Sequence, residues 1–208
     1  QKCMACGEAI KKSMKVDKHI KTFGLEKASW ADKYPYKPEV SVSLAHDSDY
    51  IFCEFEVDES ISRAQALDMG RVWEDSCVEL FISPFPEDGI YYNFECNCIG
   101  SLLLCAGKGR HERLPAPEDV LSKVHRFSSL PHETFECKSV GPWKVALMIP
   151  KSAFFLHEIK SFDGLSMKAN FYKCGDLLPS PHFISYSVIN TPEPDFHRPE
   201  FFIDLDLE

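Results

Sequence analysis

The chain has 208 residues, of which 44% are apolar, and a formal net charge of −9 at pH 7. This length and apolar content suit one large domain with a hydrophobic core, and the negative charge argues against a nucleic-acid backbone or an anionic membrane surface as a partner. No apolar stretch approaches the roughly 20 residues that a membrane-spanning helix needs, and no signal peptide is recognisable.

Residues 1–39 are expected to form a lead-in segment that packs on the domain. Positions 1–29 are rich in lysine and show no strand period, with room for a short helix. The aromatic, proline-broken stretch 30–38 is expected to lie flat on the protein.

From residue 40 to residue 208, apolar and polar residues alternate in short runs, as half-buried strands require. The predicted strands are 40–44, 50–57, 78–82, 91–97, 101–106, 124–127, 134–139, 143–149, 167–172, 182–189 and 201–207. Between them we expect a loop or one helical turn at 58–72, a long polar loop at 107–119 and a short helix at 151–159. Such a pattern predicts a single all-β domain, an antiparallel β-sandwich or jelly roll with short helical turns.

Nine cysteines are an odd number, so at least one of them lies outside any disulfide within the chain. Cys53, Cys77 and Cys96 lie in strand-like runs, where a reduced cysteine behaves as a small hydrophobic residue. Cys3 and Cys6 form a C-x-x-C pair without the further ligands of a zinc site, so a disulfide or two free thiols are expected there. This cysteine usage indicates a reducing or anaerobic habitat.

The runs 78–82 and 91–97 carry the candidate binding surface. One face of each run is apolar and predicted to lie in the core, whereas the other face carries Glu79 on the first run and Tyr91, Asn93, Glu95 and Asn97 on the second. Asparagine and glutamate are poor strand formers, and polar groups that converge on a concavity define most binding sites. We therefore predict that this polar face, together with the nearby Trp73, binds a ligand.

Three segments resemble the family 9 carbohydrate-binding modules and their relatives in the DOMON-like β-sandwich group. These segments are WEDSCVE (73–79), YYNFECNCIG (91–100) and PDFHRPEFF (194–202), and the resemblance extends from about Val40 to the C-terminus. It implies a β-sandwich that binds mono-, oligo- or polysaccharides without catalysis, at the cell surface, in the periplasm or outside the cell. In this family two aromatic rings clamp a pyranose, polar side chains bind its hydroxyl groups, and some members hold structural calcium.

By this resemblance, Trp73 matches the first clamp ring, Glu79 matches the hydroxyl-binding carboxylate, and Asn170 matches an asparagine of a late strand. Arg110 and Arg113 are candidates for an arginine near the sugar, and Tyr172, Tyr186 and Phe196 are candidates for the second ring. With the polar face included, the predicted ligand-binding residues are Trp73, Glu79, Asn93, Glu95, Asn97, Arg110, Asn170, Tyr172 and Tyr186.

Each candidate also has a structural alternative. Trp73 could belong to the core, as Trp143 is predicted to do from its alternating run, and the polar row could be an ordinary solvated face. For His197 and Arg198 we favour a structural role, in which their side chains satisfy carbonyl groups and fasten a proline-flanked loop to the sheet.

Two other functions and one metal are compatible with parts of the sequence. Haem binding would use ligands among Met69, Met148, Met167 and His182, but no C-x-x-C-H attachment motif is present. Glycoside hydrolysis would use Glu79 and Glu95 as a carboxylate pair, although nothing in the sequence indicates a raised pKa for either. Structural calcium could be held by the acidic turns 46–49 or 86–89, neither of which matches an EF-hand loop.

Overall fold

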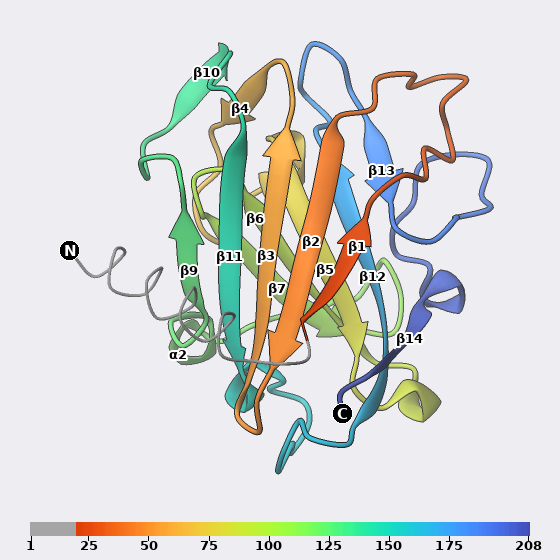
Figure 1. Ribbon diagram of the computed structural model, residues 1–208. Coiled ribbons are helices and arrows are strands. Elements are labelled where there is room, and N and C mark those ends of the chain that lie inside the picture. Colours follow the sequence, from red (N-terminus) through yellow and green to blue (C-terminus); the bar gives the residue numbers. More distant parts are fainter. Residues whose placement is uncertain (1–19) are drawn as a thin grey trace.

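Two antiparallel β-sheets lie face to face and enclose the main hydrophobic core, as Figure 1 shows. This arrangement confirms the predicted antiparallel β-sandwich. The computed structural model describes residues 20–208. Within the described residues no helix is long and apolar enough to cross a membrane.

The front sheet of Figure 1 has five strands, and the predicted strands 40–44 and 50–57 are antiparallel neighbours in it. Its strands, in spatial order, are β1 (Lys21–Gly24), β2 (Glu39–His46), β3 (Tyr50–Asp58), β11 (Trp143–Pro150) and β9 (His125–Ser128).

The rear sheet has seven strands and carries the residues of the candidate site. Its strands, in spatial order, are β13 (Phe183–Ser185), β12 (Ser166–Cys174), β5 (Cys77–Ser83), β6 (Tyr91–Asn97), β7 (Leu102–Gly107) and β8 (Leu114–Pro115), and β14 (Ile203–Asp206) pairs with β12. A two-stranded ribbon of β4 (Ser62–Ala64) and β10 (Phe135–Lys138) lies at one end of the sandwich. The short helical turns are η1 (Val72–Glu74), η2 (Pro86–Asp88), α2 (Glu118–Leu121), η3 (Lys151–Ala153) and η4 (Pro199–Phe201).

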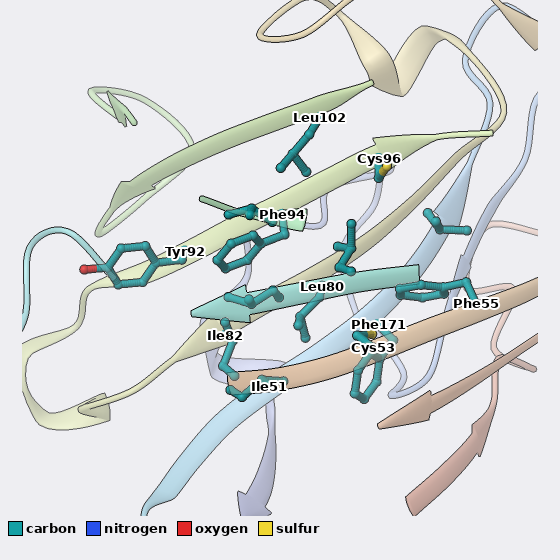
Figure 2. Close-up of a cluster of buried hydrophobic side chains, with 14 of the residues drawn as sticks. Ile51, Cys53, Phe55, Leu80, Ile82, Tyr92, Phe94, Cys96, Leu102 and Phe171 are labelled. Atoms are coloured by element: carbon teal, nitrogen blue, oxygen red, sulfur yellow. The ribbon is translucent and has the colours of Figure 1, made fainter. Parts of the chain in front are cut away.

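The core between the sheets is built from the apolar positions of the alternating strands. Figure 2 shows β3 contributing Phe55, β5 contributing Leu80, and β6 contributing Phe94 to this cluster. Trp143 is 1% exposed and belongs to the same cluster, as predicted. Burial of apolar area at about 25 cal/mol per Å² makes this cluster the main source of stability. The core uses the inner face of β5 and β6. The side chains on their other face therefore point to the outer side of the seven-stranded sheet.

A second apolar cluster covers this opposite, outer face of the seven-stranded sheet. Trp30 is 6% exposed, packs against Phe183 and Phe196, and donates an indole hydrogen bond to the carbonyl of Thr191 at 2.8 Å. Within the stretch 30–38, Trp30 therefore packs on the domain. Trp30 thus fastens the loop of residues 190–198 above the sheet.

Several local predictions were wrong. Residues 21–24 form β1 and pair with β2, because backbone hydrogen bonds hold a run too short to show a strand period. Residues 62–64 form β4 within the predicted loop, only Phe183–Ser185 of the predicted strand 182–189 is regular, and the predicted helix at 151–159 is reduced to the single turn of η3. These elements are short, and tertiary contacts rather than periodicity determine them.

All seven cysteines from Cys53 onward are free thiols. Cys53 and Cys96 lie in the core between the sheets, where they pack as small hydrophobic residues. The Cys3–Cys6 pair lies outside the described residues.

Candidate functional site

A cavity of about 370 Å³ opens on the outer face of the seven-stranded sheet. Strands β5, β6, β7 and β12 supply its floor, which includes Glu79, Asn93, Glu95, Cys105 and Cys174. Its walls come from Trp73 in η1, the loop of residues 108–113 and the loop of residues 190–198. The volume is within the range of small-molecule sites.

The motif that contains Trp73 is held in place by Asp75, whose side chain is fully buried. Its carboxylate accepts hydrogen bonds from the backbone amides of Gln65 at 3.0 Å and Ala66 at 2.9 Å, and it forms an ion pair with Arg63. A buried carboxylate with this many donors is stable and rigid. Asp75 therefore anchors the end of η1 and fixes where Trp73 projects.

Asn97 completes the same anchor and does not line the cavity. Its amide nitrogen donates to Asp75 and to the carbonyl of Ala66, each at 3.0 Å, and its oxygen accepts the backbone amide of Ser101 at 2.9 Å. Gly100 follows with φ of 90°, a conformation that favours glycine. The second motif thus has two parts, since Asn93 and Glu95 face the cavity whereas Asn97 and Gly100 shape the turn to β7.

Glu79 lies in the floor with one carboxyl oxygen free. Oε1 accepts a hydrogen bond from the thiol of Cys174 at 3.1 Å, whereas Oε2 has no hydrogen-bond partner among the described residues although the side chain is only 2% exposed. Burial, reinforced by the nearby Glu95, raises the pKa of Glu79 well above its usual value. Glu79 therefore offers a polar group that the protein itself leaves unsatisfied.

Glu95 lies opposite Glu79 on the adjacent strand and is better supported. It accepts a hydrogen bond from Asn93 at 2.7 Å, and the oxygen of Asn93 accepts one from Arg113 at 2.9 Å. Burial raises the pKa of Glu95 to about 7 despite these contacts. Arg113 also donates to the carbonyl of Tyr91 at 2.8 Å and stacks on its ring at 4.1 Å, so the line of polar groups is fixed.

Aromatic side chains form the apolar part of the wall. Trp73 is partly buried, and Phe183 and Phe196 lie in the same lining. Phe196 stacks on Tyr172 with ring centroids 4.2 Å apart and an interplanar angle of 7°. This stack supports Phe196 from behind, so Phe196 rather than Tyr172 contributes to the cavity surface.

His197 joins the loop of residues 190–198 to the sheet and also lines the cavity. Its Nδ1 is hydrogen-bonded to the hydroxyl of Tyr91 at 2.8 Å, and its ring packs on Phe81 with centroids 4.9 Å apart. Burial lowers the pKa of His197 to about 3, with the positive charge of Arg113 adding to the effect. His197 is therefore a neutral wall residue, and Arg198 pairs with Glu200 outside the cavity.

The sequence profile of carbohydrate-binding family 9 matches residues 8–207. The chain belongs to carbohydrate-binding family 9. This membership confirms the resemblance predicted from the sequence and makes non-catalytic carbohydrate binding the class of function.

Solved structures agree with the assignment of this family 9 chain. A candidate carbohydrate-binding protein from Bacteroides uniformis ATCC 8492 is 46% identical, with a TM-score of 0.89, over 99% of this chain and 92% of its own. A family 9 module from Caldicellulosiruptor kristjanssonii in complex with glucose is 13% identical, with a TM-score of 0.55, over 83% of this chain and 78% of its own. A family 9 module from the same organism in complex with cellotriose is 12% identical, with a TM-score of 0.58, over 91% of this chain and 83% of its own. No curated protein sequence matches the chain.

Five of the nine predicted ligand-binding residues line the cavity of this family 9 domain: Trp73, Glu79, Asn93, Glu95 and Arg110. The structure does not bring Asn97, Asn170, Tyr172 or Tyr186 to it. Asn170 is fully buried, and its oxygen accepts the backbone amides of Phe171 and Ser187. Tyr186 packs against Phe23 at the margin of the core, on the other face of the sheet.

Other lining residues had no signal in the sequence. Asp176 follows β12, and burial raises its pKa to about 6, helped by the charge of Glu74. Phe183 and Cys174 resemble ordinary core positions in their strands, and His111 belongs to a polar loop. Only the folding of distant loops over the sheet makes them neighbours.

The carboxylates of the two acidic turns considered for calcium take part in contacts within the protein. Asp47 accepts the backbone amides of Asp49 and Tyr50, and Asp49 pairs with Lys151. In the second turn Asp88 accepts the amide of Ile90 and pairs with His157. Both turns use their carboxylates to shape the backbone.

The candidate haem ligands are also engaged elsewhere, and none lines the cavity. Met167 lies in the core between the sheets, Met148 packs on Phe52 and Ala146 in a separate cluster, and Met69 packs against the core from its loop. His182 is fully buried and contacts Lys173. Their separation favours structural roles for all four.

Proposed function

We propose that the cavity on the seven-stranded sheet binds a pyranose without hydrolysing it. The observation that carries this proposal is the free Oε2 of Glu79, a buried acceptor at the floor of a cavity with aromatic walls. An unsatisfied buried polar group costs free energy, so a ligand hydroxyl that bonds to it gains that free energy on binding.

The remaining lining fits the two-sided chemistry of a sugar ring. A pyranose has an apolar CH face that packs on flat aromatic side chains, and Trp73 and Phe196 offer such surfaces. Its hydroxyl groups need donors and acceptors in fixed positions, and Glu95, Asn93 and Arg113 are already linked in one hydrogen-bonded line. Trp73 is proposed to stack on the ring and Glu79 to accept its hydroxyl hydrogen bonds.

The carboxyl pair supports binding rather than hydrolysis, although both pKa values are raised. Glycoside hydrolases place two carboxyl groups on either side of the scissile bond. Glu79 and Glu95 are direct cross-strand partners on one sheet face, so a sugar lies over both of them. Two neighbouring carboxyl groups beneath one ring suit hydroxyl binding.

Relatives in complex with glucose and cellotriose make β-linked glucose chains the first ligands to test. We propose that the chain acts in polysaccharide recognition, in the periplasm, at the cell surface or outside the cell. Its fit to family 9 over residues 8–207 supports this setting.

Isothermal titration against a panel of mono- and oligosaccharides, in the presence of EDTA, tests the proposal. Selective binding is expected, with Trp73→Ala lowering affinity about 10- to 100-fold, the effect of losing a central aromatic contact. Trp73→Phe is the matched variant that keeps a ring, and it should retain most of the affinity. The unfolding midpoint of Trp73→Ala should stay close to that of wild type because the side chain is only partly buried. Silence across the panel, or equal binding by Trp73→Ala, would refute the proposed site.

A further inference from the structure

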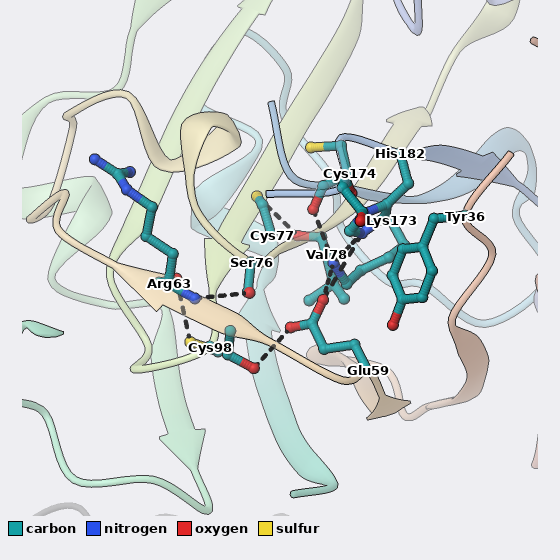
Figure 3. Close-up of polar contacts among 12 residues, drawn as sticks. Tyr36, Glu59, Arg63, Ser76, Cys77, Val78, Cys98, Lys173, Cys174 and His182 are labelled. Carbon is teal, nitrogen blue, oxygen red and sulfur yellow. Dashed lines mark hydrogen bonds and ion pairs between the residues drawn. The ribbon is translucent and has the colours of Figure 1, made fainter. Parts of the chain in front are cut away.

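Three metal-ligating side chains converge beside the cavity floor. Cys77 and Cys174 are direct cross-strand partners on β5 and β12, and Glu79 follows Cys77 by two residues on the same face of β5. Their ligand atoms all lie within 4.8 Å of one another, and all three side chains are buried. Figure 3 shows the thiols of Cys77 and Cys174 on the same side of the two strands.

The donor set has the chemistry of a thiophilic cation. Two thiolates and one carboxylate are ligands that zinc binds well, whereas calcium takes only oxygen ligands. Tetrahedral coordination has four positions, so three protein ligands leave one open. Glu79 and Cys174 line the cavity, which places that open position toward solvent or a bound ligand.

The free oxygen of Glu79 is an independent indication of a ligand. Oε2 has no hydrogen-bond partner among the described residues at 2% exposure, and a metal ion would satisfy it as well as a hydroxyl would.

The other buried thiols lack such a setting. Cys53 and Cys96 pack in the apolar core, and Cys98 donates to the carbonyl of Arg63 at 3.6 Å. Within residues 20–208, Cys77, Glu79 and Cys174 are the one group of three such ligands in mutual reach.

We propose that Cys77, Glu79 and Cys174 form a binding site for a thiophilic divalent cation such as Zn²⁺. Binding forms two metal–sulfur bonds and one metal–oxygen bond; the two thiol protons, and the carboxyl proton of any protonated Glu79, are released to solvent. The hydrogen bond from the Cys174 thiol to Glu79 is replaced by coordination of both groups to the ion. No electron transfer is involved. The metal site shares Glu79 with the proposed saccharide contact, so the metal is titrated without saccharide and the saccharides are titrated in EDTA.

Titration of the reduced full-length chain with Cd²⁺, without saccharide, tests the site. Cys3→Ser, Cys6→Ser and Cys137→Ser are introduced first, because a C-x-x-C pair and an exposed thiol would bind the probe themselves. One equivalent of Cd²⁺ should saturate a thiolate-to-metal charge-transfer band. Cys77→Ser and Cys174→Ser should each lower the affinity at least 10-fold, and Glu79→Gln should weaken it by a smaller factor.

Cys96→Ala is the matched control, since it removes a buried thiol on the core face and should leave the titration unchanged. Zn²⁺ should also raise the unfolding midpoint of the background protein, because a ligand that binds only the folded state stabilises it, and this shift should vanish in Cys174→Ser. If Cys77→Ser does not fold, the metal affinities of Cys174→Ser and Glu79→Gln test the site.

Two results would overturn the proposal. A band that survives the loss of Cys77 and Cys174 would place the metal elsewhere. Absence of any band with both thiols titratable would show that no site exists.

Discussion

Two groups of buried charged side chains lie near the same end of β12 and differ in how they are satisfied. The closed cluster, Glu59, Lys173 and His182, lies inside the sandwich and is shown in Figure 3. The open cluster, Glu79 and Glu95, lies on the outer face of the sheet at the cavity floor. Both are almost completely removed from solvent.

In the closed cluster every charge meets an opposite charge or a hydrogen-bonding group. Lys173 lies 2.9 Å from Glu59 and 2.6 Å from His182, and Glu59 also accepts hydrogen bonds from Trp143 and Ser62, each at 2.9 Å. Burial is the largest influence on Glu59 and by itself would raise its pKa. The charge of Lys173, its hydrogen bond and that of Ser76, and the proximity of His182 together outweigh burial and hold this pKa below its usual value.

In the open cluster two carboxyl groups lie side by side, and their hydrogen bonds come from a thiol and an amide. Both pKa values are therefore raised. Burial of a charged side chain is therefore not in itself a sign of function. A buried charge that the protein satisfies internally supports the fold, whereas one that it leaves unsatisfied in a cavity is available to a ligand.

The largest expected effect comes from breaking the closed cluster with Lys173→Met. Removing one partner of a buried ion pair leaves an uncompensated charge, which costs about 3–5 kcal/mol of unfolding free energy. Urea unfolding followed by tryptophan fluorescence would measure this loss. Lys168→Met is the control, because Lys168 lies on the same strand but pairs with Asp204 at the exposed surface. Equal stability of the two variants would show that the closed cluster contributes nothing.

Substitution in the open cluster should change saccharide affinity and leave the unfolding free energy nearly unchanged. Glu79→Gln keeps the shape of the side chain and removes a group that folding penalises, so the unfolding free energy should change by less than about 1 kcal/mol. Saccharide affinity should fall about 10- to 100-fold, as expected for a lost hydrogen bond to a charged or strongly polar group. Calorimetry on Glu79→Gln beside the exposed-surface variant Glu56→Gln measures both quantities. A large fall in the unfolding free energy with unchanged saccharide affinity would show that Glu79 has a structural role instead.

The pH dependence of stability should have opposite signs in the two clusters. Burial, aided by Lys173, lowers the pKa of His182 to about 3. Between the usual pKa of about 6.5 and this value, the unfolded chain takes up a proton that the folded chain refuses. The contribution of His182 to the unfolding free energy is therefore complete above pH 6.5 and is lost as the pH falls. Glu95, with a folded pKa of about 7, contributes fully below its usual pKa of about 4.3 and loses that contribution as pH rises through 7.

Urea unfolding of His182→Gln and Glu95→Gln from pH 4 to 7.5 measures these contributions as differences from wild type. Each difference should change by about 1.4 kcal/mol per pH unit for one proton, within its own window and in opposite directions. Parallel curves for wild type and both variants would contradict the assignment.

The sequence predicts one of these clusters much better than the other. The alternation of 78–82 and 91–97 places Glu79, Asn93 and Glu95 on one face, and the structure brings them together at the cavity floor. Lys173 offered no such signal, because it lies just past the predicted strand 167–172 and its partner Glu59 lies far away in the chain. Periodicity predicts which residues share a face of a strand, but it does not predict which distant residues they contact.

The same limit explains what was missed at the site. The polar row was expected to face outward, yet its members are nearly buried because the loops 108–113 and 190–198 close over the sheet. Asn97 has the same parity as Glu95 but lies past the cavity, where it supports Asp75. Tyr172 lies behind Phe196, a relation set by the stacking of two rings from distant segments. Long-range packing, rather than local pattern, decides these positions.

A crystal structure of the protein with cellotriose, or with whichever saccharide titration identifies, is the most direct test of the proposed saccharide site. We expect a pyranose ring against Trp73, with a ring hydroxyl within hydrogen-bonding distance of Oε2 of Glu79. A second groove of about 880 Å³, lined by Pro38, Glu56 and Lys144, provides the contrast. A saccharide bound in that groove, with none in the cavity of Glu79 and Glu95, would show that the proposed site is wrong.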